Sequence, residues 1–259
     1  MIDCHVHIEK GDYNKEWIEQ FVKTAVERNI DEIWLLEHCY RFKEFIGMYD
    51  SVCKHSGFIN QWFHKKAGIY QLSDYLKLID MIQKETYSVK IKFGLEVCYF
   101  RQYEDFVRKQ TWGANLDFLV GSVHFIDDFA FDHNTELWAG IDVDEMYHRY
   151  FQTSIDLAQS GIYSGIAHPD SIKLFGHRAS FDLSEYYDTL AYELAKHKMY
   201  AEQNSGVKRR TNAELGMDKE MLKYMKKHRV QIQTASDAHR PEDVGLYVKE
   251  MNEELKDNV

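Results

Sequence analysis

The chain has 259 residues, a formal charge of −10, 44% hydrophobic residues and 29% charged residues. This composition belongs to an ordinary globular protein with a sizeable core, and it excludes a disordered chain. The negative charge argues against a nucleic acid or a membrane surface as partner, because such partners bind basic faces.

The chain contains only two prolines, Pro169 and Pro241, and no Pro/Gly/Ser-rich linker. We therefore expect a single domain over residues 1–259. No apolar run approaches the ~20 residues that a membrane-spanning helix needs, and no signal sequence is evident, so we expect a cytoplasmic location. The four cysteines form no CxxC pair, which favours reduced thiols over a disulfide framework or a zinc finger.

Hydrophobic periodicity predicts strands that alternate with helices along the whole chain. The predicted strands cover residues 2–7, 32–38, 90–99, 116–124, 163–168, 199–205 and 230–236. The predicted helices cover residues 14–28, 73–87, 102–112, 144–160, 184–197, 218–227 and 242–255. Residues 40–68 are expected to form a long loop with short helices, and residues 125–141 an insertion.

This alternation indicates parallel strands with crossover helices, either in a closed barrel or in an open sheet. The positions of the polar side chains separate the two. Candidate ligands follow the ends of predicted strands at His7, His38, Glu96, His124, His168 and His239. In a β/α barrel these ends meet at one rim, where active sites are built, whereas an open sheet would spread them along its edge. We therefore predict an α/β barrel of about seven strands.

Two histidines stand two residues apart in the first predicted strand. His5 and His7 project from the same face, because residues i and i+2 of a strand do so, and their spacing suits one shared metal ion. Near the other end of the chain, Asp237 and His239 repeat this spacing with a carboxylate. By the same alternation, Cys4 is expected to point outward to the helices.

Nine side chains of the types that bind metals are collected at this rim. The set comprises His5, His7, Asp12, His38, Glu96, His124, His168, Asp237 and His239. Imidazoles and carboxylates suit zinc, iron or manganese, and nine groups exceed the needs of one ion, so we expect two to three divalent transition metals. The alternative, a set of ordinary core histidines, is disfavoured because clustered buried imidazoles without a metal carry desolvation and repulsion costs.

One basic cluster, Lys208-Arg209-Arg210, directly follows a predicted strand. A cation at this rim could clamp a phosphate, while a solvated surface is the ordinary alternative. Arg41, three residues after His38, is a second candidate. Two further histidines, at positions 133 and 177, lie in loops from which they could approach the rim.

The motifs, taken together, resemble those of the PHP (polymerase and histidinol phosphatase) family. The matching motifs are the HxH pair, Glu37-His38, Gly94-Leu95-Glu96, Gly121-Ser122-Val123-His124, Ala167-His168-Pro169-Asp170 and Ser236-Asp237-Ala238-His239. Within the family the chain is most similar to the stand-alone histidinol-phosphate phosphatases, whose Asn-Ser-Gly-Val-Lys segment and Ser-Asp-Ala-His-Arg-Pro ending it shares.

The resemblance implies a distorted (β/α)7 TIM-like barrel with a metal site at the C-terminal rim of its strands. It implies a first ion on His5, His7, Glu96 and Asp237, a second on Glu96, His124 and His168, and a third on Asp12, His38 and His239. Glu9 lies close to Asp12 as an alternative ligand. The candidate catalytic residues are Asp237, His239 and Glu96, and Lys208 stands where many relatives would carry an arginine.

The activity implied is metal-assisted hydrolysis of a phosphate monoester, above all of L-histidinol phosphate in histidine biosynthesis. Another small phosphorylated metabolite or a nucleotide remains an alternative substrate. A metal-dependent exonuclease is disfavoured by the net charge, since a strand-tracking groove should be basic. A metal-binding regulatory module without catalysis is the alternative from a different class, and the intact ligand set argues against it.

Overall fold

The computed structural model describes residues 1–211 and 213–257, and within them seven parallel strands form one sheet in sequence order. The strands are β1 (Ile2–His7), β2 (Glu32–His38), β3 (Lys90–Cys98), β4 (Phe118–Ser122), β5 (Gly165–Ile166), β6 (Tyr200–Asn204) and β7 (Gln231–Ala235). The α-helices are α1 (Lys15–Glu27), α2 (Asp50–His55), α3 (Gly57–Lys66), α4 (Leu72–Ile82), α5 (Glu104–Thr111), α6 (Val143–Gln159), α7 (Ser184–Lys196), α8 (Gly206–Thr211), α9 (Lys219–Lys227) and α10 (Val248–Asp257). Short 3₁₀ helices are η1 (Cys39–Arg41), η2 (Lys43–Tyr49), η3 (Arg101–Tyr103), η4 (Thr135–Trp138), η5 (Ser171–Lys173) and η6 (Pro241–Asp243).

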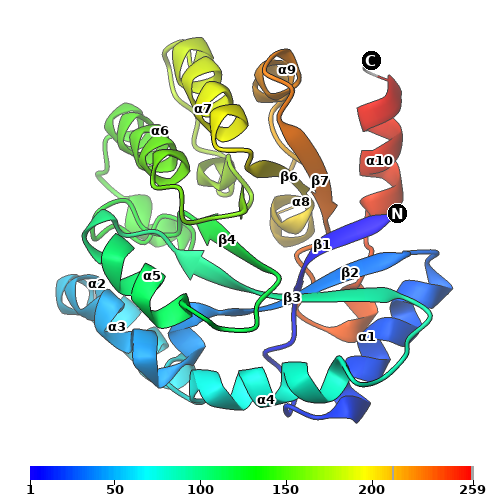
Figure 1. Cartoon of the computed structure of the whole chain (residues 1–259). Helices are drawn as coiled ribbons and strands as arrows, with labels where there is room; N and C mark the ends of the chain where they lie inside the picture. Colours follow the sequence, from blue (N-terminus) through cyan, green and yellow to red (C-terminus); the bar gives the residue numbers. More distant parts are fainter. Residues whose placement is uncertain (212, 258–259) are drawn as a thin grey trace.

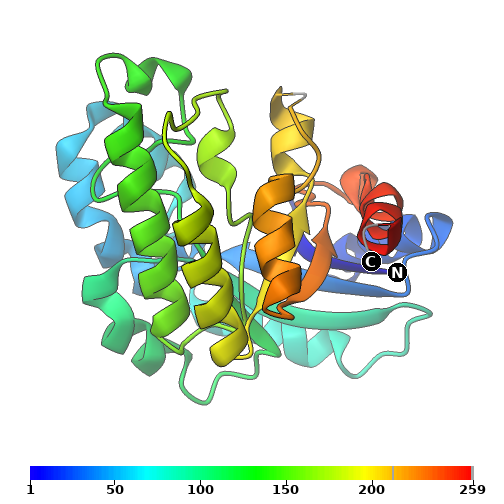
Figure 2. The same ribbon diagram turned by 90° about the horizontal axis from the view of Figure 1, so that it is seen from above.

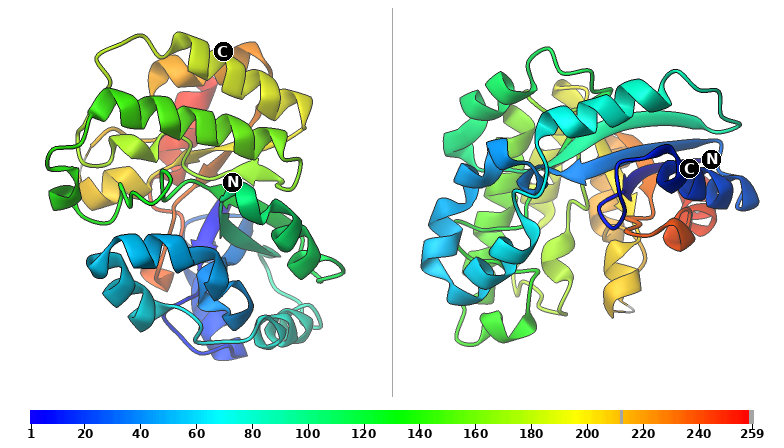
Figure 3. Two further views of the ribbon diagram at one scale, coloured as in Figure 1. Left: turned by 90° about the vertical axis from the view of Figure 1, so that its left-hand side faces the viewer. Right: turned by 90° about the horizontal axis from the view of Figure 1, so that it is seen from below.

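The helices surround the strands, as Figure 1 shows, so the predicted (β/α)7 barrel is confirmed. Helices α6, α7 and α9 stand in a row on one side (Figure 2). Helices α2 and α3 lie at the opposite end of the molecule from α10 (Figure 2 and Figure 3). Among the described residues, no helix combines the length and the apolar character that a bilayer span requires.

The barrel closes between β1 and β7 through few backbone contacts. Val6 and Ala238 form an isolated parallel bridge. The buried carboxylate of Asp3 accepts hydrogen bonds from the backbone N–H groups of Ser236 and Gly245, at 2.8 and 2.7 Å. A side chain of the first strand thus replaces part of the missing strand ladder, and it holds the end of β7 in place.

The interior of the barrel holds a small apolar cluster. Its members are Cys4, Trp34, Leu36, Phe118, Val120, Ala167, Tyr200 and Ala235, which come from opposite sides of the sheet. Cys4 therefore points into the barrel, and the prediction that it faces the helices is wrong. The register of β1 against β2 shifts between Asp3 and Val6, and such a bulge interrupts the alternation of side chains along a strand.

Several segments differ from the sequence predictions. The last helix begins at Val248 rather than at residue 242, because Gly245 and Tyr247 adopt φ angles of +75° and +62° that a continuous helix excludes. Residues 206–211 form helix α8 where only a turn is expected. Strand β5 has two residues instead of six. The first two differences both lie at the rim that carries the candidate ligands.

Candidate metal centre

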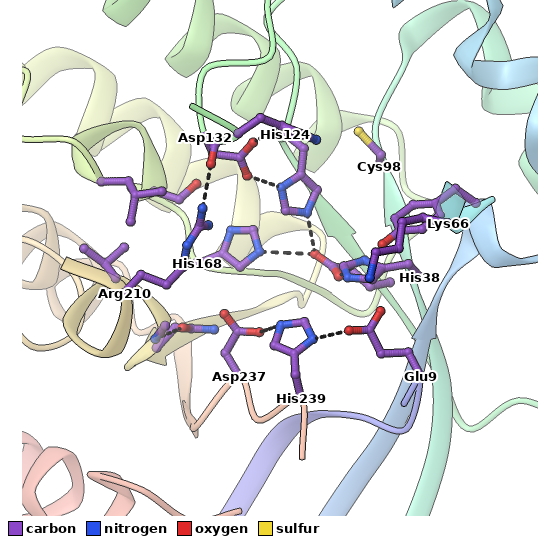
Figure 4. A pocket seen from close by; sticks show the side chains of 18 of the residues that line it. Glu9, His38, Lys66, Cys98, His124, Asp132, His168, Arg210, Asp237 and His239 are labelled. Atoms are coloured by element: carbon purple, nitrogen blue, oxygen red, sulfur yellow. Dashed lines mark hydrogen bonds and ion pairs between the residues drawn. The ribbon is translucent and has the colours of Figure 1, made fainter. Parts of the chain in front are cut away.

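A cavity of about 550 Å³ opens at the carboxyl ends of the strands (Figure 4). One side carries the polar side chains Glu9, His38, Glu96, His124, Asp132, His168, Asp237 and His239. Another part of the wall is aromatic and consists of Tyr40, Tyr49, Phe58, Trp62 and Phe125. The cavity therefore combines a site for ions and anions with a surface for an organic group.

The carboxylate of Glu96, on β3, lies at the centre of the polar side. Its Oε2 is 2.7 Å from His38 Nδ1, and its Oε1 is 2.9 Å from His124 Nε2 and 3.1 Å from His168 Nε2. Burial opposes the negative charge, but the neighbouring histidines outweigh it and hold the pKa of Glu96 well below its ordinary value. Glu96 is therefore ionised, and each oxygen faces imidazole nitrogens.

His5 and His7 direct their Nε2 atoms toward each other, at a separation of 2.9 Å. These nitrogens lie 3.7 and 3.4 Å from Glu96 Oε2, and 3.7 and 3.6 Å from Asp237 Oδ1. Four donors around one tetrahedral ion at about 2.0 Å would stand about 3.3 Å apart. The structure thus brings together the four residues expected at the first ion, with a spacing that fits a metal.

A second group of imidazoles stacks beside the first. The ring of His7 stacks on the rings of His38 and His239, with centroid distances of 4.1 and 4.3 Å. These three residues offer nitrogens within 4.8 Å of one another. Burial, and then the charges of the adjacent histidines, lower the pKa of His7 well below its ordinary value. His7 is therefore a neutral imidazole, the form that binds metals.

The structure does not bring Asp12 to the cavity. Asp12 is exposed in the turn between β1 and α1, whereas Glu9 lines the cavity and accepts a hydrogen bond from His239 Nδ1 at 2.9 Å. After Glu9 the chain turns back, and the N–H of Gly11 reaches the carbonyl of Ile8. This turn directs Asp12 outward, so Glu9 takes its place in our assignment of the third ligand set.

Two buried carboxylates that the sequence analysis missed hold the outer nitrogens of the histidines. Glu202 Oε1 accepts from His5 Nδ1 at 2.9 Å, and Asp132 Oδ2 accepts from His124 Nδ1 at 2.7 Å. Such partners fix the tautomer so that Nε2 faces the metal. The only signal for Glu202 was an acidic residue in an otherwise buried strand, and a charged group in that position is rarely without a partner.

Comparison with known proteins places this geometry in a family. The sequence profile of the PHP domain matches residues 3–206, which is most of the chain. The chain belongs to the PHP domain family. A probable histidinol-phosphatase of Deinococcus radiodurans is 28% identical over 192 residues, which cover 72% of each chain.

Solved structures share the fold of this PHP domain. A putative histidinol phosphatase of Listeria monocytogenes aligns with a TM-score of 0.75 at 20% identity, over 95% of this chain and 97% of that one. The histidinol phosphate phosphatase of Lactococcus lactis, complexed with zinc, L-histidinol and phosphate, aligns with a TM-score of 0.71 at 18% identity, over 99% and 92% of the two chains.

Two of the four basic residues expected to bind phosphate lie away from the cavity of this PHP domain. Arg41 is 6% exposed, and it donates to the backbone carbonyls of Glu9 and Lys66 at 3.0 and 3.3 Å. Lys208 is half-buried on α8 and does not line the cavity. Arg41 therefore holds the loop that carries Glu9 and is not placed to bind a substrate.

Arg209 and Arg210 both line the cavity. Arg209 donates through Nε to the carbonyl of Ser236 at 3.0 Å and through Nη1 to Asp243 at 3.2 Å, so it stabilises the segment around Asp237. Arg210 is exposed, and among the residues that the structure describes it donates one hydrogen bond, from Nη2 to the carbonyl of Asp132 at 2.7 Å (Figure 4). Arg210 keeps further N–H groups for an anion in the cavity.

Gly206, the first residue of α8, allows this helix to approach the metal ligands. A Cβ atom at this position would overlap the Asp237 carboxylate and would lie 3.0 Å from Asn204 Oδ1.

We expect Gly206→Ala to displace Asp237 and to lower metal affinity and turnover by at least about 10-fold, the smaller effect seen when a metal ligand loses its support. Metal titration of the purified variant measures this loss, with Gly47→Ala as the control, because a Cβ at Gly47 meets no atom within 4 Å. Unchanged metal affinity would show that Asp237 tolerates the shift.

Metal loading is expected to release protons. Burial disfavours charge on His124 and His239, but Asp132 and Glu96 raise the pKa of His124 to about 10, while Asp237 and Glu9 raise that of His239 to about 9. Both rings thus carry a proton at pH 7 in the metal-free protein and must lose it to bind an ion. Calorimetric zinc titrations at pH 7, in buffers of different ionisation enthalpy, should detect this release, and affinity should rise with pH toward about 9. Binding without proton release would contradict the assignment of these two ligands.

Proposed function

We propose that this PHP domain is a metal-dependent phosphatase that hydrolyses a phosphate monoester, with L-histidinol phosphate as the expected substrate. The observation that carries the proposal is the convergence of six imidazoles on the carboxylates of Glu96 and Asp237, in one cavity that also presents Arg210. The two named histidinol phosphatases with the same fold support the choice of substrate.

We propose two to three divalent ions, zinc, iron or manganese, held in three sets of ligands, of which the first two share Glu96. The first set is His5, His7, Glu96 and Asp237; the second is Glu96, His124 and His168; the third is Glu9, His38 and His239. When bound, such ions polarise phosphoryl oxygens and lower the pKa of water to about 7, so that hydroxide is available at neutral pH.

The side chains of the chain itself have separate roles in this proposal. Glu96 and Asp237 supply the negative charge that concentrates cations at the reaction site, and His239 is held between Asp237 and Glu9. Arg210 binds the non-bridging phosphoryl oxygens, over which the negative charge of the phosphoryl group is spread in the transition state. The aromatic wall, which includes Trp62, excludes water from the organic part of the substrate.

The test is phosphate release by the metal-loaded protein from L-histidinol phosphate, a sugar phosphate, a nucleotide 3′-phosphate and a single-stranded oligonucleotide. We expect L-histidinol phosphate to have the highest kcat/KM. A higher value for another monoester would overturn the substrate but retain the chemistry. No release from any of them, with elemental analysis showing bound metal, would favour the regulatory module. The cytoplasmic location expected from the sequence stays a prediction.

Arg210→Met is expected to lower kcat/KM by about 10- to 100-fold, because charge-assisted hydrogen bonds contribute about 1.5–3 kcal/mol each. The same change at Lys208 is the matched control, since Lys208 lies on the same helix but does not line the cavity. Steady-state kinetics on the best monoester distinguish the two variants. Equal losses in both, or a loss only at Lys208, would assign the phosphate contact to another residue.

A further inference from the structure

The carboxylate of Asp132 joins two imidazoles with different surroundings. Its Oδ2 accepts from His124 Nδ1 and its Oδ1 accepts from His133 Nδ1, both at 2.7 Å. Asp132 is buried, and although burial opposes its charge, the two histidines keep its pKa well below the ordinary value. One end of this chain of hydrogen bonds, His124 Nε2, faces Glu96. The other end belongs to a histidine that the metal assignment does not use.

His133 lies in the wall of the same cavity, and its side chain is 11% exposed. Because Nδ1 is bound to Asp132, the opposite nitrogen Nε2 points away from that carboxylate, and within residues 1–211 and 213–257 it has no hydrogen-bond partner. The ring stands edge-on to Trp62 at 4.6 Å and packs on Phe125 at 5.3 Å. Its orientation is thus fixed, and its free nitrogen is left for a group in the cavity.

Asp132 also anchors the side chain that we assign to the phosphate. Its backbone carbonyl accepts from Arg210 Nη2 at 2.7 Å, while its carboxylate accepts from His133 (Figure 4 labels Asp132 and Arg210). Arg210 and His133 therefore hydrogen-bond to two different groups of Asp132, its backbone carbonyl and its carboxylate. Arg210 and His133 both line the cavity, so a phosphoryl group bound by Arg210 would share the cavity with His133.

We propose that His133 is the general acid that protonates the leaving oxygen of the ester, and that Asp132 positions it. This inference rests on the proposed phosphatase function. An alkoxide is a poor leaving group in water at neutral pH, so a positioned proton donor is needed, and imidazole is the side chain best suited to this task near pH 7. A buried carboxylate that accepts from Nδ1–H orients the ring and stabilises the imidazolium, whose Nε2–H is the acid, as in other His–Asp pairs.

Proton transfer from His133 accompanies the cleavage of the ester bond. Hydroxide derived from water forms a new bond to phosphorus while the bond from phosphorus to the ester oxygen breaks. The electron pair of the broken bond stays on the ester oxygen, which takes the proton from His133 Nε2. The products are the free alcohol and inorganic phosphate, and neutral His133 regains a proton from water in the open cavity.

The test compares two leaving groups in the metal-loaded enzyme. An alkyl ester, L-histidinol phosphate or the best alkyl monoester of the panel, requires protonation of its leaving oxygen, whereas p-nitrophenyl phosphate releases an anion that is stable without a proton. We expect His133→Asn and His133→Gln to lose about 10²- to 10⁴-fold in kcat on the alkyl ester. We expect less than about a tenth of that loss on the aryl ester. Retained aryl hydrolysis also shows that the variants are folded and loaded.

The matched control is His148→Asn. His148 is likewise bonded through Nδ1, to Tyr186, and stacks on Phe181 at 4.0 Å, but it lies on α6 away from the cavity. Elemental analysis of the His133 variants should give the metal content of the wild type, which a metal ligand would not. Equal losses on both esters, or a reduced metal content, would overturn the proposal. Failure of the wild type to release phosphate from any ester would instead reject the proposed function.

Discussion

The variant Glu96→Gln is expected to lose bound metal and to lose more than about 100-fold of its turnover. Removal of a residue that supports a metal ligand lowers metal affinity or activity by about 10–100-fold, and Glu96 would itself be a ligand in our assignment. Its two oxygens face His38, His124 and His168 within 3.1 Å, so one amide replaces a charge shared by two proposed ion sites. A neutral amide also leaves the protonated imidazole of His124 without one of its buried counter-charges.

Elemental analysis and phosphate release should be measured on the same preparation of this variant. Glu27→Gln is the matched control, because Glu27 is an exposed residue of α1 and is 4.0 Å from Lys23. Circular dichroism separates loss of metal from loss of fold. A Glu96→Gln protein with full metal content and wild-type turnover would contradict the bridging role that we assign to Glu96.

The convergence of most of the proposed ligands could be predicted, because it depends on strand periodicity. Residues at i and i+2 share a face, and the carboxyl ends of parallel strands meet at one rim, so His5, His7 and Glu96 could be placed before any coordinates. The same reasoning failed at Cys4. A bulge in β1 is a local change in register, and no pattern of apolar residues in this strand reveals it.

The supporting residues could not be predicted, because they depend on contacts between distant segments. Asp132 meets His124 only through the folded insertion between β4 and α6. Arg41 follows a ligand in the sequence, yet its guanidinium binds backbone carbonyls because the long loop after β2 encloses it. Glu9 and Asp12 are separated by one turn of the chain, and the direction of that turn decides which of them reaches His239.

The variant Asp3→Ala is expected to have the second large effect, because Asp3 lies where β1 and β7 close the barrel. The buried carboxylate of Asp3 binds the backbone N–H groups of Ser236 and Gly245. Within residues 1–211 and 213–257, Val6 and Ala238 form the one isolated backbone bridge at this closure. A buried donor without a partner costs about 1–3 kcal/mol, so the loss of both hydrogen bonds should lower the free energy of unfolding by about 2–6 kcal/mol. Urea denaturation of the metal-free protein measures this directly.

The same variant should weaken metal binding, because Ser236 precedes Asp237, which adopts a φ of +53°. A backbone conformation of this kind costs about 1–3 kcal/mol and persists only where the surrounding contacts impose it. Asp31→Ala is the matched control, since the Asp31 carboxylate is 84% exposed in its ion pair with the amino terminus, and exposed pairs contribute less than about 1 kcal/mol. If Asp3→Ala retained full stability and full metal affinity, closure of the barrel would not be what holds Asp237 beside His5 and His7. If both are lost together, the two ends of the chain form the metal centre only as one closed structure.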